Sequence, residues 1–218
     1  YQVASSLLYP RADESHTSAQ WDGALCFLQF LQTLFDAERQ TLPFDPWLDF
    51  AFCTEEELAG SGAAEEYRLF LRRFRMEYVY ELLRLGREAT PFRTLEHIAG
   101  VHHAAMTVAR AFKAGGGHID LGLMSGAAAA HDIGKFGCRP GERVPYLHYY
   151  YTDRWCSWRG LGSIGHIAAN HSVWDLEIEN LSAESLVLVY ADFRVKQSRG
   201  ADGGEIAELF SLKDAFDV

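Results

Sequence analysis

A histidine and an aspartate, His131 and Asp132, are adjacent at the end of the apolar run in AAAAHDIGKFG. An imidazole and a carboxylate are both ligands for divalent cations, and a carboxylate can bridge two ions through its two oxygens. Two residues cannot hold a divalent cation alone. A metal site at this pair therefore requires further histidines or carboxylates from other parts of the chain.

Two further candidate ligands lie on predicted helices, one before this pair and one after it. At 100° per residue, His97 lies at the edge of the core-facing stripe of its helix, whereas His103 falls on the far side. Asp192 interrupts the apolar run LVLVYA, and a buried carboxylate is costly unless it is paired or bound to a cation. Each also has a simpler interpretation, as a satisfied core histidine for His97 and as a salt bridge to Arg194 or Lys196 for Asp192. Beside the adjacent pair, the metal interpretation is favoured for both.

Three more histidines lie between the His-Asp pair and Asp192. His166 and His171 flank IAAN and are five residues apart, so they lie on different sides of an ideal helix. One of them can be a ligand while the other binds a phosphate, or His171 can lie just past the helix end. His148 is a further candidate, and each of the three taken alone can also be an ordinary polar residue.

The elements that must position these side chains are predicted to be helices. Hydrophobic periodicity, capping residues and glycine or proline breaks predict helices over residues 21–35, 63–89, 90–113, 118–132, 163–170 and 183–196. Thr54 and Glu57 form a predicted capping box, and the arginines of residues 63–89 are expected to face solvent. Residues 136–160 are interpreted as a long aromatic and basic connection with room for one short helix, typical of a functional lid. Because no alternating β pattern or internal repeat occurs, the predicted fold class is all-α.

Composition limits the partners and the compartment. The 218 residues include 30 acidic and 20 basic side chains, and the formal charge of -10 argues against a nucleic-acid polymer or an anionic membrane as the main partner. We find no apolar run of about 20 residues and no leader pattern, so we expect neither a membrane span nor a signal peptide. The cysteines lack CxxC spacing and are expected to be thiols of a cytoplasmic protein. The start at Tyr1 rather than Met fits a segment of a longer polypeptide.

In their order along the chain, His97, the His131-Asp132 pair and Asp192 resemble the HD superfamily of metal-dependent phosphohydrolases, with HIAGV, HDIGK and YADFRV in register. The resemblance covers residues 90–197. It implies a helical bundle with one or two divalent ions, chosen from Mn, Fe, Mg, Ni, Co and Zn. We expect a metal-binding domain over 90–200, an N-terminal helical extension over 1–89 that the resemblance does not cover, and a tail over 201–218. The implied metal ligands are His97, His131, Asp132, Asp192, His166 and His171.

The same resemblance implies roles in catalysis for Asp132, Lys135, His166 and His171. Asp132 would bridge two metals, and Lys135 falls in the HDIGK position, where it could meet a phosphate. Cyclic di-GMP is not a favoured substrate, because NHSVWDLE stands where the cyclic-dinucleotide branch has its GYP motif.

The predicted function is hydrolysis of a phosphoester, in a nucleotide or another small phosphorylated metabolite, by a metal-activated water. Arg139 and Arg143 would help Lys135 to hold the anion, and the tyrosines at 149–151 would stack on a base or pack the connection against the bundle. Two alternatives stay open. One is a di-iron oxygenase that oxidises a small organic substrate, since histidine-rich ligation also suits iron. The other is a non-catalytic metal-binding or ligand-binding regulatory module. An oligomer is possible in each case.

Overall fold

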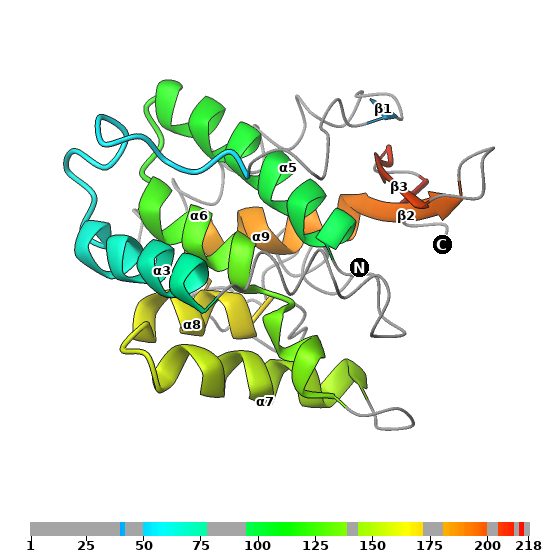
Figure 1. Ribbon diagram of the computed structural model, residues 1–218. Helices are drawn as coiled ribbons and strands as arrows, with labels where there is room; N and C mark the ends of the chain where they lie inside the picture. The colour runs from blue at the N-terminus through cyan, green and yellow to red at the C-terminus, as the bar shows by residue number, and fades with distance from the viewer. Residues whose placement is uncertain are drawn as a thin grey trace, which may run out of the picture.

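The computed structural model describes residues 40–41, 50–77, 95–138, 144–171, 181–199, 205–211 and 214–215. Most of these residues are helical, which confirms the predicted all-α class. The α-helices are α3 (Ala64–Met76), α5 (Leu95–Ala114), α6 (Leu121–Ala130), α7 (Val144–Ser157), α8 (Gly162–Ala169) and α9 (Ala183–Arg194). A 3-10 helix, η1 (Ile133–Gly137), follows α6. The helices pack as a bundle around α6 (Figure 1). The helix predicted over residues 21–35 lies outside the described residues.

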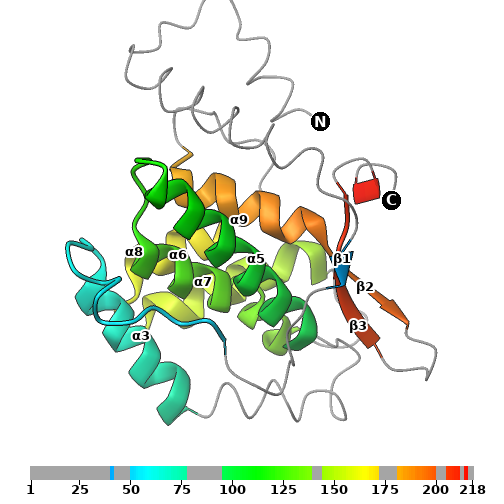
Figure 2. The same ribbon diagram turned by 90° about the horizontal axis from the view of Figure 1, so that it is seen from above.

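A small antiparallel sheet accompanies the bundle, which the sequence did not predict. Strands β1 (Gln40–Thr41), β2 (Val195–Arg199) and β3 (Glu205–Leu209) are ordered β1-β3-β2, with Val195 opposite Leu209 and Arg199 opposite Glu205. Two views place the sheet at the end of the bundle away from α3 (Figures 1 and 2). The predicted helix to Lys196 was therefore too long, and part of the predicted tail forms strand β3.

A buried arginine explains where α9 ends. The guanidinium of Arg194 donates from Nε to the carbonyl of Phe210 and from Nη1 to the hydroxyl of Tyr190. The backbone N–H of Phe210 donates to the carbonyl of Arg194 at 2.8 Å. These bonds join the end of α9 to the residue that follows β3, so the chain leaves the helix in a fixed direction.

Helix α6 is the centre of the bundle, as its small and apolar sequence predicts. Every residue of α6 except Leu123 is buried, and the helix contacts α3, α5, α8 and α9. A Cβ on Gly126 would lie 2.6 Å from Cδ1 of Ile164, so a larger residue there would require the Ile164 side chain to shift. The helix ends at Ala130, and the His131-Asp132 pair that follows it is buried in the interior of the bundle.

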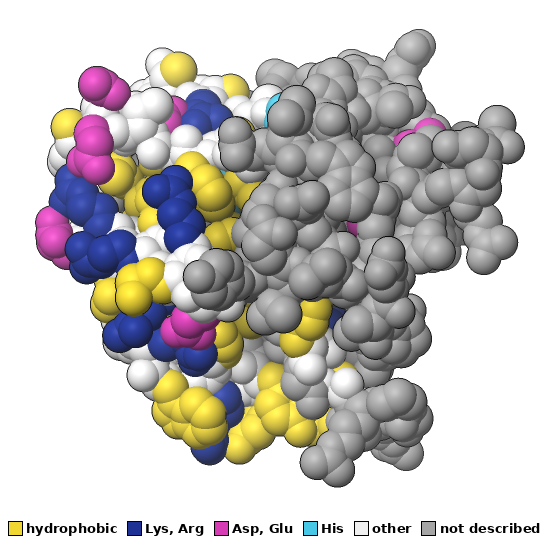
Figure 3. Space-filling view, in the orientation of Figure 1, with side chains coloured by type: hydrophobic (Ala, Val, Ile, Leu, Met, Phe, Trp, Pro, Cys, Tyr) yellow, Lys and Arg dark blue, Asp and Glu magenta, His cyan; other side chains and the backbone are white. Residues whose placement is uncertain are grey.

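Helix α3 is shorter than predicted. It ends at Met76, with Glu77 in a turn, and residues 78–94 lie outside the described residues. Arg72 and Arg75 are exposed, as predicted, whereas Arg68 and Arg73 are only partly exposed, so the prediction of a solvated arginine face is met in part. Lys and Arg side chains gather on the left of the molecule, over α3 (Figure 3).

The predicted capping box is confirmed. The N–H of Thr54 donates to the carboxylate of Glu57 at 3.0 Å, and the N–H of Glu57 donates to the hydroxyl of Thr54 at 3.3 Å. The box begins a series of turns before α3. Glu57 also pairs with Arg110 at 2.5 Å, which attaches these turns to α5.

Residues 144–157 form a regular helix, α7, where the sequence analysis predicted a connection with at most a short helix. The proline that suggested a loop, Pro145, lies in the first turn, where no intrahelical N–H bond is lost. Helix α7 packs on η1 and α8. This correction affects the choice of candidate metal ligands, because α7 carries His148.

A buried polar chain joins α3, α5 and α6 on the side of α6 that faces α3. The hydroxyls of Tyr67 and Ser125 lie 2.9 Å apart, and Nε2 of His102 lies 2.9 Å from the same serine. Burial lowers the pKa of His102 to about 3, so its imidazole is neutral near pH 7. His102 is thus a core histidine and not a ligand.

Asp120 caps α6 and also holds the turn before α3. Its carboxylate accepts from the N–H of Leu123 at 3.0 Å, the hydroxyl of Ser61 at 2.6 Å and the N–H of Ala63 at 3.1 Å. Because Asp120→Ala removes the cap and leaves partly buried donors unpaired, we expect the free energy of unfolding to fall by about 2 kcal/mol. Urea unfolding followed by circular dichroism measures the change. Asp120→Asn keeps an acceptor and should lose less; equal losses in both variants would contradict the capping role.

One expectation from composition, that the cysteines are thiols, is met among the described residues. Cys53, Cys138 and Cys156 are free thiols. In the part of the chain that the structure describes, every helix is too short or too polar to cross a membrane.

Candidate metal centre

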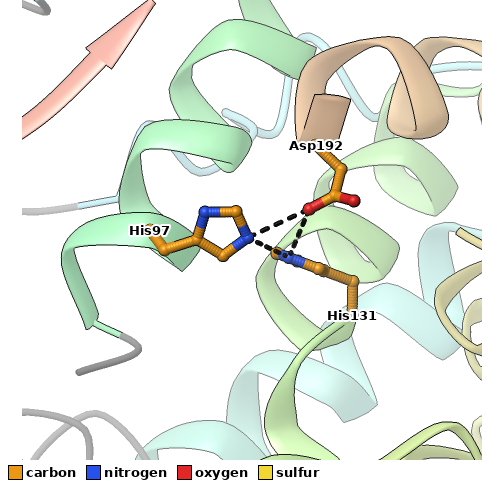
Figure 4. Close-up of side chains that lie close together, drawn as sticks. All are labelled: His97, His131 and Asp192. Atoms are coloured by element: carbon orange, nitrogen blue, oxygen red, sulfur yellow. Dashed lines mark hydrogen bonds and ion pairs between the residues drawn. The ribbon is translucent and has the colours of Figure 1, made fainter. Parts of the chain in front are cut away.

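Five helical elements bring histidines and aspartates to one place in the bundle. His97 lies in the first turn of α5 and Asp192 in the last turn of α9, and both point toward His131 at the end of α6 (Figure 4). The remaining members come from the turn after α6, from α7 and from the residue after the C-cap of α8: Asp132, His148 and His171. These six side chains form the candidate centre.

One group of ligand atoms, the outer half-site, consists of His97, His131, Asp192 and one oxygen of Asp132. Nε2 of His97 lies 3.0 Å from Oδ1 of Asp192 and 3.4 Å from Nε2 of His131. Oδ2 of Asp132 lies 3.5 Å from Nε2 of His97 and 3.6 Å from Nε2 of His131. The side chains of His97 and Asp192 are 17% and 22% exposed, so this half-site opens to the surface.

A second group, the inner half-site, consists of His148, His171 and the other oxygen of Asp132. Oδ1 of Asp132 lies 3.5 Å from Nε2 of His148 and 3.8 Å from Nε2 of His171. The two imidazole Nε2 atoms are 3.5 Å apart. Both histidines are buried. The carboxylate of Asp132 thus presents one oxygen to each half-site, which is the arrangement of a bridging ligand.

Backbone carbonyls fix the orientation of two of the imidazoles. Nδ1 of His131 donates to the carbonyl of Ala128 at 2.7 Å, and Nδ1 of His171 donates to the carbonyl of Ala168 at 2.6 Å. In a neutral imidazole the other nitrogen, Nε2, then carries a lone pair. Histidine ligands of metal sites usually donate their second ring N–H in this way.

The spacing of the ligand atoms fits divalent cations. Ligand atoms about 2.1 Å from an ion lie about 3.0 to 3.4 Å apart in octahedral and tetrahedral arrangements. The two Nε2–Nε2 separations, 3.4 Å and 3.5 Å, exceed ordinary hydrogen-bond distances. A hydrogen bond from His97 to Asp192 explains one contact of the cluster, but it does not explain the close approach of ring nitrogens in both half-sites.

The protonation states of the cluster also suit a metal. Burial lowers the pKa of His131 to about 3, so the ring is neutral near pH 7. Burial opposes the ionisation of Asp132, but the neighbouring imidazoles and the ammonium of Lys135 bring its pKa well below the ordinary value. For Asp192 the hydrogen bond from His97 lowers the pKa despite burial. Two ionised, largely buried carboxylates face the ring nitrogens of the cluster, and this negative charge favours a bound cation.

We compared the chain with models of protein families, with curated proteins and with solved structures. None of the three comparisons finds a match. The support for the candidate centre therefore comes from the geometry and the chemistry of its side chains.

The structure brings together most of the residues that the sequence analysis selected. His97, His131, Asp132, His171 and Asp192 meet in the cluster, and His171 lies just past the end of α8, which was one of the two open possibilities. Asp192 does not pair with Arg194, whose guanidinium is directed to Phe210 and Tyr190 instead. Lys135 lies at the opening of the centre, 25% exposed, with its ammonium on Oδ2 of Asp132. Arg139 and Arg143 lie outside the described residues.

His166 is the one predicted ligand that the structure places elsewhere. Its side chain is exposed on α8, and Nε2 lies 3.4 Å from the amide of Asn170. Because α8 continues through residue 169, His166 faces away from the bundle while His171 turns inward after the helix. His148 takes the place that the sequence analysis had assigned to His166. A signal was available in the register of α7, where His148 and the buried Thr152 share one face at a spacing of four residues.

His148→Ala and His166→Ala form a matched pair for testing this assignment. We expect His148→Ala to lose the inner of two bound ions, because only His171 and Asp132 then remain there. His166→Ala should keep both ions, since its ring is outside the cluster. Elemental analysis of the dialysed proteins measures the difference. Retention of both ions by His148→Ala, or loss of one by His166→Ala, would show that the structure assigns the wrong histidine.

Proposed function

We propose that this chain is a metal-dependent phosphohydrolase of the HD type that acts on a small phosphorylated substrate. The observation that carries the proposal is the carboxylate of Asp132, with each oxygen directed to a separate group of imidazoles. Two-ion sites bridged in this way support hydrolysis of phosphoesters. The order of the ligands along the chain, which resembles the HD superfamily, agrees with this geometry.

In the proposed reaction, the residues of the centre form the ligand sets of two metal ions. His97, His131, Asp192 and Asp132 would hold the outer ion, and His148, His171 and Asp132 would hold the inner ion. When bound, the ions lower the pKa of a water ligand and neutralise charge on the phosphoryl oxygens. Because His97 and Asp192 are partly exposed, we expect the substrate to enter at the outer half-site.

Lys135 is a partly exposed cationic side chain that contacts the candidate centre. Its ammonium contacts Asp132, and its partial exposure leaves it within reach of an incoming anion. We expect it to hold the phosphate by charge, as a lysine does without the bidentate geometry of arginine. In this proposal Lys135 binds the substrate, and the two aspartates keep the site anionic enough to retain the ions.

A panel of phosphoesters tests the proposal. The protein, reconstituted separately with Mn²⁺, Co²⁺, Fe²⁺ and Zn²⁺, would be assayed for phosphate release from nucleoside monophosphates, cyclic nucleotides and small phosphorylated metabolites. Hydrolysis of at least one class that is lost in a metal-binding variant supports the proposal. A metal-bound protein that releases phosphate from none of them supports the regulatory module.

Oxygen chemistry at the same centre is the second candidate, and the four imidazoles favour it. Nitrogen ligands suit Fe, Mn, Co and Zn better than Mg, and two irons in such a site could activate oxygen. An iron-containing, coloured preparation that consumes oxygen in the presence of a small organic substrate would favour this candidate over hydrolysis.

A further inference from the structure

A threonine hydroxyl connects the turn that contains the bridging aspartate to the helix that carries His148. The hydroxyl of Thr152 donates to the carbonyl of His131 at 3.1 Å. The same oxygen accepts from the backbone N–H of Gly134 at 3.0 Å. Thr152 is completely buried, so water does not compete for these bonds.

These two bonds enclose Asp132 in the sequence. One partner is the carbonyl just before Asp132, and the other is the N–H two residues after it. The hydroxyl of a threonine inside a helix often donates a hydrogen bond to the carbonyl four residues earlier in the same helix. Here the hydroxyl donates across the helix boundary to another element, and it is therefore available to fix the position of the turn.

The backbone of the turn also approaches α7 closely. A Cβ on Gly134 would lie 1.9 Å from the carbonyl oxygen of His148 and 2.6 Å from the backbone nitrogen of Thr152. The turn and α7 are thus in direct backbone contact at His148 and at Thr152, one helical turn later. The hydroxyl bonds and this contact together leave little freedom for the turn to move relative to α7.

We infer that Thr152 is a positioning residue that sets the distance between the bridging carboxylate of Asp132 and the imidazole of His148, and so determines the affinity of the inner half-site. The side chain does not touch the ligand atoms. It acts on both ends of the Asp132 turn and belongs to the helix of His148. The inference rests on the proposed function only in requiring that the centre binds metal.

The test measures Mn²⁺ binding to the wild-type protein and to Thr152→Val, which keeps the shape of the side chain and removes the hydroxyl. Loss of an interaction that orients a metal ligand typically weakens the metal affinity about 10- to 100-fold. We expect this loss for the inner ion of Thr152→Val, with the outer ion retained. Equilibrium dialysis with elemental analysis gives the two dissociation constants.

Two further variants separate positioning from packing. Thr152→Ser keeps the hydroxyl and should retain both ions close to wild-type affinity. Thr107→Val removes an exposed hydroxyl that donates to the carbonyl of His103 at 2.9 Å on α5, and it should bind metal as the wild type does. If Thr152→Val does not fold, metal binding by Thr152→Ser tests the inference instead. Loss of the inner ion from the folded serine variant would overturn it, because that variant keeps the hydroxyl.

The outcomes distinguish the inference from the proposed function. A wild type that binds two ions, together with unchanged dissociation constants in Thr152→Val, overturns the role of Thr152 and leaves the metal centre in place. Equal weakening in the valine and serine variants also overturns it, because packing would then explain the effect. A wild type that binds no divalent metal overturns both the inference and the proposed centre.

Discussion

Replacing Asp132 with asparagine is expected to remove both bound ions and to lower kcat/KM for the phosphoester substrate roughly a thousandfold or more. The substitution keeps the size of the side chain but leaves one neutral oxygen where two charged oxygens face the two half-sites. Metal ions supply several kcal/mol of transition-state stabilisation, and each 1.36 kcal/mol corresponds to a factor of ten. Elemental analysis and a phosphate-release assay measure the two effects.

Asp153→Asn is the matched control for this variant. Asp153 is exposed on α7, and its carboxylate contacts only the hydroxyl of Ser157 at 3.5 Å among the described residues. It should retain both ions and full activity. If Asp132→Asn keeps its metal, the bridging role of this carboxylate is wrong; if it loses metal but keeps activity, the reaction does not depend on the centre.

The second large effect is expected at Gly134, in the turn after the His-Asp pair. In Gly134→Ala the new methyl group would collide with the backbone of α7 at His148 and Thr152, and backbone atoms cannot move aside as a flexible side chain can. We expect a loss of about 3 kcal/mol in the free energy of unfolding, at the upper end for added volume in a packed interior. Where the variant remains folded, α7 must shift and the inner ion should be lost. Urea unfolding and metal analysis measure both.

Gly162→Ala is the control for this prediction. Gly162 opens α8, and a Cβ at this position would meet no atom within 4 Å. Alanine there should be neutral or slightly stabilising, because it restricts the unfolded chain. If Gly134→Ala is as stable as Gly162→Ala and binds the same amount of metal, the close contact between the turn and α7 does not exist in solution.

The sequence predicted the helices that bury the centre better than it predicted the ends of those helices. The run of small residues before His131 predicts a helix buried on several sides, and the periodicity around His97 predicts an inward-facing imidazole; the structure has both. Strand β2 was missed because the apolar pattern of α9 continues into Val195. What ends the helix is the contact between Arg194 and Phe210, which lies 16 residues along the chain and has no local signal.

The assignment of the second group of histidines shows a similar limit. The local sequence does not decide between His166 and His171, because the position at which α8 ends determines which of them turns inward. His148 was assigned to a connection because Pro145 and the aromatic residues around it resemble a loop. A proline in the first turn of a helix is compatible with the helix, and the buried Thr152 one turn after His148 is the residue that indicates a packed face.

The most direct test of the two-ion centre is the stoichiometry and the magnetic state of bound Mn²⁺. Metal-free protein would be titrated with Mn²⁺, analysed for bound metal and examined by electron paramagnetic resonance. Because the carboxylate of Asp132 faces both half-sites, we predict two ions per chain with a spectrum of exchange-coupled Mn²⁺. A single bound ion with an uncoupled spectrum, or no binding, would contradict the bridged centre on which the proposed function depends.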